Sequence, residues 1–234
     1  MPAALSAASK IVQLRSITSR ATRAGSPLTV SPTVLPNRHT SSEAMETVMQ
    51  SWIWAIPRPE GAKPCADYSD GKVRIHSYEI KEDAPLTVSR PDDIILNIGR
   101  RSLKRLDGYR CLPNVIRTPL LDEPLSGIVS RFAGADVQYL PATVEARDGV
   151  TTCYRLARPL VHLPCLDPDR SDVSWVVPGE SVAMARHIEF RPGCLGDRHF
   201  VRDSYTHFTV VSEALKDALL ETRDPGLFFI EPEN

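Results

Sequence analysis

The 234-residue sequence lacks the cysteine and histidine patterns that usually mark a metal site or a disulfide framework. Its five cysteines are odd in number and widely spread, and no two of them form a C-x-x-C pair. The histidines form no H-x-H or H-E-x-x-H pattern, and no glycine-rich phosphate-binding loop is present. We therefore expect buried free thiols in a reducing cytosol, with no metal and no cofactor.

Long hydrophobic runs and a strong net charge are also missing. No segment approaches the ~20 consecutive apolar residues that a membrane helix needs, and residues 1–30 lack the continuous apolar block of a secretory signal. The net charge is −1, which gives the chain no general attraction to nucleic acid or to a membrane surface. These absences predict a cytoplasmic protein without a nucleic-acid or membrane partner.

Residues 1–44 differ in composition from the rest of the chain. Ala, Ser, Thr and Pro supply 24 of these 44 residues, and five basic residues stand against one acidic residue. The remaining 190 residues hold 23 basic and 28 acidic residues, so they carry a net charge of −5. An organellar transit peptide has such an acid-poor composition. We favour a disordered or non-native N-terminal extension, with a true start near Met45 or Met49, because this composition buries too little apolar surface to fold.

The clearest helix is expected in the last folded segment, after residue 212. Ser212 is a good N-cap, because its hydroxyl can accept from the free N–H groups of the first turn. Leu215, Leu219 and Leu220 form the expected buried stripe. Asp224-Pro-Gly226 should end the helix, with Gly226 as a left-handed cap before a short strand at 227–230. The expected solvent-facing residues are Lys216, Asp217 and Glu221.

Alternating or continuous apolar segments predict strands along the rest of the chain. The expected strands cover residues 51–56, 72–80, 93–98, 136–141, 143–146, 151–156, 160–163, 175–177, 184–190 and 200–203, and a second helix covers 124–133. Residues 143–156 read as a hairpin with an Asp-Gly turn. Each helix leads into a strand, which suggests two helix–strand units on one sheet. The prediction is a single α+β domain over residues 49–232, with a mostly antiparallel mixed sheet and two or three packed helices.

An acidic turn at residues 165–172 is one candidate functional segment. Its carboxylates, Asp167, Asp169 and Asp172, could hold a hard cation such as Ca²⁺. The calcium-loop pattern fails, however, because Asp172 stands where glycine is needed and Pro178 where glutamate is needed. We therefore interpret the segment as a surface turn, and take its three carboxylates as the best candidates for contact with a protein partner.

A second candidate is Ser181 in the segment Gly179-Glu-Ser-Val-Ala183, which is close to the G-x-S-x-G nucleophile elbow of serine hydrolases. An acid (Asp197 or Asp203) and a base (His199 or His207) follow in the required order. Ala183 replaces the final glycine, and the residues after it alternate like a strand where the elbow needs a helix. A serine hydrolase using Ser181 is the alternative function.

Three segments together resemble the immunity protein 43 family, also called DUF1629, over residues 50–232. The first is IVSRF at 128–132 leading into VQYLP at 137–141, and the second is the turn CLDPDRS at 165–171. The third runs from Phe200 through TVVSEALKDAL at 209–219 to GLFF at 226–229. The resemblance implies a non-catalytic immunity protein that binds and neutralises a cognate protein toxin of a bacterial polymorphic-toxin or secretion system. It implies no catalytic residue and no cofactor.

Overall fold

The computed structural model describes residues 49–56, 64–68, 75, 79–81, 85–87 and 90–232. The chain divides into two units, Met1–Met45 and Glu46–Asn234, and every described residue belongs to the second. The predicted extension at 1–44 lies outside the described residues, as does most of the strand predicted at 72–80. Ile80, at the end of that predicted strand, lies instead in the short 3-10 helix Glu79–Lys81.

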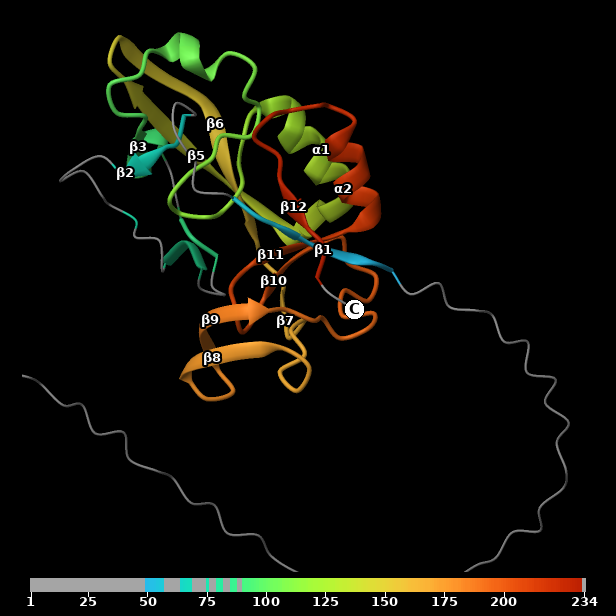
Figure 1. Ribbon diagram of the computed structural model, residues 1–234. Helices are drawn as coiled ribbons and strands as arrows, with labels where there is room; N and C mark the ends of the chain where they lie inside the picture. Colours follow the sequence, from blue (N-terminus) through green and yellow to red (C-terminus); the bar gives the residue numbers. More distant parts are fainter. Residues whose placement is uncertain are drawn as a thin grey trace, which may run out of the picture. The chain divides into compact units, whose positions relative to one another are not determined.

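The described part of the second unit is an α+β domain, as predicted (Figure 1). Its strands are β1 (Ser51–Trp54), β2 (Asp67–Tyr68), β3 (Ile95–Asn97), β4 (Leu120–Leu121), β5 (Val137–Ala146), β6 (Gly149–Pro159), β7 (His162–Leu163), β8 (Asp172–Val177), β9 (Ser181–His187), β10 (Phe200–Asp203), β11 (Thr209–Ser212) and β12 (Phe229–Ile230). Its α-helices are α1 (Glu123–Ala133) and α2 (Glu213–Leu220). Further 3-10 helices cover Pro91–Asp93, Leu103–Leu106 and Gly134–Asp136.

The strands form two five-stranded sheets and one separate hairpin. The β1 sheet has the order β12-β1-β11-β10-β7, and the β5 sheet has the order β2-β3-β5-β6-β4. Strands β8 and β9 pair only with each other among the described residues. Neighbours run antiparallel except for β7–β10 and β3–β5. The predicted hairpin around Asp148 is present as β5–β6, with a bulge near Thr143.

The two helices lie side by side and join the two sheets (Figure 1). The apolar cluster beneath them takes residues from both helices, from the β1 sheet and from the β5 sheet. The helix–strand units were predicted to share one sheet, which is wrong, because α1 leads into the β5 sheet and α2 into the β1 sheet. The sequence predicts that each helix–strand unit contributes a strand to a sheet. It does not show whether the two units contribute to the same sheet.

Helix α2 begins as predicted, but one of its faces was misassigned. The Ser212 hydroxyl accepts from the Leu215 N–H, and Leu215 and Leu219 are buried. Leu220, however, is 46% exposed. Residues five apart on a helix are rotated by about 140°, so Leu220 leaves the face that Leu215 defines. Lys216 is buried instead of solvent-facing, with its Nζ 3.6 Å from the ring centroid of Trp52.

The turn after α2 uses a different left-handed residue from the one predicted. Arg223 has a φ of 55°, whereas Gly226 is not among the residues with positive φ. Gly226 is required for space, because a Cβ there would lie 1.7 Å from the Cys111 carbonyl oxygen. The buried Asp224 carboxylate fixes this close approach by accepting from the backbone N–H groups of Arg110, Cys111 and Gly226.

Candidate interaction face

The β8–β9 hairpin stands apart from both five-stranded sheets, at the end of the domain away from α1 and α2 (Figure 1). An isolated two-stranded hairpin is only marginally stable in water, so its anchor to the domain decides its position. That anchor is the turn between β10 and β11. The Trp175 ring meets the Tyr205 ring edge-on at 5.7 Å, and the Val182 N–H donates to the Tyr205 carbonyl oxygen at 3.0 Å.

A buried carboxylate holds this anchoring turn in place. The Asp203 side chain accepts from the Thr206 N–H at 2.7 Å, from the Thr206 hydroxyl at 2.6 Å and from the Leu166 N–H at 3.0 Å. Asp203 was one of the acids proposed for a hydrolase. Its contacts instead connect the β10–β11 turn to the segment that enters the hairpin.

The outer face of the hairpin is apolar and exposed. Val176 is 67% exposed and Met184 is 52% exposed, and the neighbouring Val177 is exposed as well. Trp175 pairs with Val182, and both are half-buried, whereas Met184 pairs with Ser174, which lies on the same exposed face of β8 as Val176. A register shift between Ser174 and Trp175 interrupts the simple alternation along β9 and separates Val182 from Met184. This exposed apolar group makes the outer face a candidate contact surface for another molecule.

The acidic turn lies at the base of the hairpin and is held in one conformation. Asp169 and Asp172 are exposed, whereas Asp167 is half-buried. The Asp167 carboxylate accepts from the Asp169 N–H at 3.1 Å, and the Asp167 N–H donates to the Glu189 carbonyl oxygen at 2.9 Å. This is the surface turn that the sequence predicts. Within the described ranges, no group of three or more His, Cys, Asp or Glu side chains is arranged to hold a metal ion.

Glu189 makes an ion pair and a histidine contact beside this turn. Its carboxylate lies 2.6 Å from the Arg170 guanidinium and 3.0 Å from His187 Nε2. Arg170 is therefore drawn toward Glu189, and the carboxylates of Asp169 and Asp172 remain at the surface. The turn presents negative charge next to the apolar face of the hairpin.

Ser181 lies in a hairpin and not in a strand–turn–helix elbow. It is the first residue of β9 and pairs with Val177 across the turn. The two histidines proposed as the base, His199 and His207, lie in other parts of the fold. His199 Nδ1 lies 2.7 Å from the Ser212 hydroxyl that caps α2, and His207 lies in the β10–β11 turn with a φ of 58°. Asp197 is exposed, with its carboxylate 3.4 Å from Arg198 Nε.

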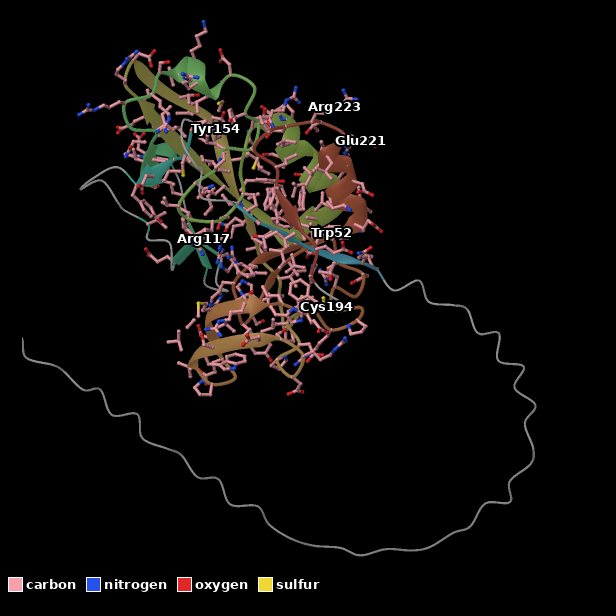
Figure 2. All side chains as sticks on the ribbon, viewed as in Figure 1. Trp52, Arg117, Tyr154, Cys194, Glu221 and Arg223 are labelled. Carbon is pink, nitrogen blue, oxygen red and sulfur yellow. The ribbon has the colours of Figure 1, made fainter. Side chains whose placement is uncertain are left out.

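A cleft that the sequence did not reveal lies beside β9. Its volume is about 380 Å³, and its walls come from β9, from the ends of β1 and β12, and from the loop that holds Arg117. Ile53, Trp54, Phe208 and Ile230 supply apolar surface, and Arg117 is labelled in Figure 2 between the β5 sheet and the hairpin. Five separate segments build the cleft, so no local pattern in the sequence could have predicted it.

The Arg117 backbone has an unusual conformation that its neighbours maintain. Its φ is 60°, a region that residues with a side chain rarely adopt. The buried Asn114 side chain accepts from the Arg117 N–H at 3.0 Å and donates to the carbonyl oxygens of Leu112 and Thr118. Arg117 and Arg186 both line the cleft, which gives it basic residues beside its apolar surface.

The sequence matches no protein-family model and no curated protein. No helix in the described part of the chain is both long enough and apolar enough to cross a membrane.

Proposed function

We propose that the chain is an immunity protein that binds and neutralises a cognate protein toxin without catalysis, and that the β8–β9 hairpin and the acidic turn form its binding face. The observation that carries the proposal is the exposed apolar group of Val176, Val177 and Met184, on a hairpin that pairs with neither five-stranded sheet. The resemblance of residues 50–232 to an immunity family supports the same conclusion.

The chemistry of this face fits a partner that carries positive charge. Binding energy at protein interfaces comes mainly from a few buried apolar anchors, with charged residues around them. Val176 and Met184 would supply the anchors, and Asp169 and Asp172 would supply charge at the edge. Such charge attracts a basic partner during the encounter. The free state of all five cysteines supports the cytoplasmic location that belongs to this proposal.

The proposal is tested by titrating a candidate toxin with the purified chain and by co-expressing the two in bacteria. A neutralising protein that acts by binding inhibits fully at about one chain per toxin molecule. The double variant Val176→Asp/Met184→Asp should weaken the complex by about 100-fold, because it places charge at both apolar anchors. Val150→Asp is the matched control, since Val150 is also apolar and 61% exposed but lies on β6.

The same assay separates binding from the hydrolase alternative. Ser181→Ala should leave protection unchanged if the chain acts by binding. Protection that requires the Ser181 hydroxyl, or that persists when toxin is in large excess, would replace the binding proposal with catalysis. Loss of binding by Val150→Asp alone would move the interface to the β5–β6 hairpin.

A further inference from the structure

Two cysteines that are distant in the sequence are in contact in the structure. Cys165 precedes the acidic turn, Cys194 follows β9, and both side chains belong to one apolar cluster. The backbone holds them together, because the Arg191 N–H donates to the Cys165 carbonyl oxygen at 2.8 Å and the Cys194 N–H donates to the Arg191 carbonyl oxygen at 3.1 Å. The same cluster includes Phe190 and Leu195. Figure 2 labels Cys194 at this end of the domain.

The two thiols differ in a way that assigns them different roles. Cys194 is half-buried and lies 3.8 Å from the Ser51 hydroxyl, whereas Cys165 is fully buried. A hydrogen-bonding interaction with the neighbouring Cys165 thiol holds the pKa of the Cys194 thiol below its usual range, although burial acts in the opposite direction. The same interaction, together with burial, raises the pKa of Cys165. Cys194 is thus the accessible thiol with the greater thiolate fraction, and the thiolate is the reactive form.

We propose that Cys165 and Cys194 form a reversible disulfide when the protein meets a peroxide, and that this bond closes the base of the β8–β9 hairpin. The Cys194 thiolate attacks a peroxide oxygen, the O–O bond breaks, and Cys194 becomes a sulfenic acid. The Cys165 sulfur then attacks the Cys194 sulfur and releases water. For hydrogen peroxide, two thiols lose two electrons and two protons, and one peroxide becomes two waters.

The disulfide would close a loop of the chain that contains the hairpin. Residues 166–193 lie between the two cysteines, and this loop holds the acidic turn, β8 and β9. Closing a loop of this length lowers the conformational entropy of the unfolded chain. The oxidised protein should therefore be more stable against unfolding than the reduced protein. This inference does not depend on toxin binding.

The other cysteines are not placed for this reaction. Cys111 is fully buried, and burial raises the pKa of its thiol, with the nearby Asp224 carboxylate adding to the effect. Cys65 is half-buried, and burial likewise raises its pKa. Cys153 is exposed on β6, where its sulfur lies 3.1 Å from the Thr151 hydroxyl, so it is a site for intermolecular disulfides that an experiment must remove.

The test uses the full chain with Cys153→Ser to prevent intermolecular disulfides. The folded protein is treated with hydrogen peroxide, free thiols are alkylated under denaturing conditions, and intact mass and peptide maps are recorded. We expect one disulfide that joins Cys165 to Cys194, a mass lower by about 2 Da before alkylation, and full reversal by dithiothreitol. The Tm of the oxidised protein should rise by several degrees.

Two variants on the same background make the outcome decisive. Cys194→Ser should abolish the disulfide while the protein keeps its cooperative unfolding. Cys165→Ser should leave Cys194 as a sulfenic acid that dimedone captures. Direct oxidation of Cys194 to a sulfinic acid while Cys165 stays free would overturn the proposal, as would a disulfide that includes Cys65 or Cys111. If Cys165→Ser does not fold, the peptide map of the Cys153→Ser protein decides, because it shows which cysteines the disulfide joins.

Discussion

At the residue scale, several polar side chains hold loops or turns in place through hydrogen bonds that the neighbouring sequence does not predict. Asp203, Asp224 and Asn114 each fix a turn by accepting or donating several backbone hydrogen bonds. Arg158 is fully buried, with its Nε donating to the Ile80 carbonyl oxygen at 2.8 Å and its Nη1 donating to Gln138 at 2.8 Å. Unpaired buried polar groups are costly, so such residues determine where loops can cross the core.

The contact between Cys165 and Cys194 predicts an order of thiol reactivity. Cys194 and Cys65 are both half-buried, but the pKa of Cys194 is lowered by the hydrogen-bonding interaction with Cys165, whereas burial raises the pKa of Cys65. At neutral pH, iodoacetamide should therefore alkylate Cys194 before Cys65, because the thiolate is the nucleophile. Peptide mapping against time measures both rates. Faster alkylation of Cys65 would contradict the assigned roles.

A pair of glycines tests how closely the chain after α2 packs. Gly226→Ala would bring a Cβ to 1.7 Å from the Cys111 carbonyl oxygen, and Gly127→Ala on α1 would meet nothing within 4 Å. We expect Gly226→Ala to lower the free energy of unfolding by more than about 2 kcal/mol, since backbone must move. Gly127→Ala should raise it by about 0.5–1 kcal/mol, because alanine favours a helix. Urea unfolding of both variants measures the difference, and equal effects would show that the approach at Gly226 is looser than described.

At the element scale, α2 offers two adjacent leucines with opposite environments. Leu219 is fully buried between the helices and the β1 sheet, whereas Leu220 is 46% exposed. Leu219→Ala should lower the free energy of unfolding by about 2–5 kcal/mol, as expected for a cavity in a packed core. Leu220→Ala should change it by less than about 0.5 kcal/mol. Denaturant unfolding of the two variants compares them directly, and a larger loss for Leu220 would mean that α2 is rotated about its axis.

The elements that the sequence predicts well are those encoded by neighbouring residues. Ser212 caps α2 through a bond to Leu215, three residues away, and the Asp-Gly turn forms the β5–β6 hairpin as expected. The features that were predicted wrongly depend on contacts between residues far apart in the sequence. Arg223 and not Gly226 takes the left-handed conformation because Gly226 is pressed against Cys111, more than a hundred residues earlier. The acidic turn was found from its composition, but the cleft and the Cys165–Cys194 contact required the folded chain.

At the scale of the whole domain, the two sheets and two helices form one packed body. The β8–β9 hairpin contacts it at the β10–β11 turn, through Trp175 and Val182 against Tyr205. A separate apolar cluster joins Val201 of β10 and Val210 of β11 to Cys165 and Phe190, which lie before β8 and after β9 in the chain. Substitutions in the helices should therefore act on unfolding, whereas substitutions on the outer hairpin face should act only on the proposed toxin binding.

The acidic turn gives the last prediction, which concerns how the domain meets a partner. Asp169→Asn/Asp172→Asn removes two exposed carboxylates and leaves Asp167, whose carboxylate supports the turn by accepting from the backbone N–H of residue 169. If a basic toxin binds here, the association rate should fall several-fold at low salt, with little change in the dissociation rate. The difference should shrink toward zero as salt screens the charges, over a Debye length of about 3 Å at 1 M. Stopped-flow mixing across a salt series measures both rates.

Asp107→Asn/Glu123→Gln is the matched control, because it removes the same number of exposed carboxylates away from the hairpin. Equal slowing by the two double variants would show that net charge, and not the acidic turn, governs the encounter.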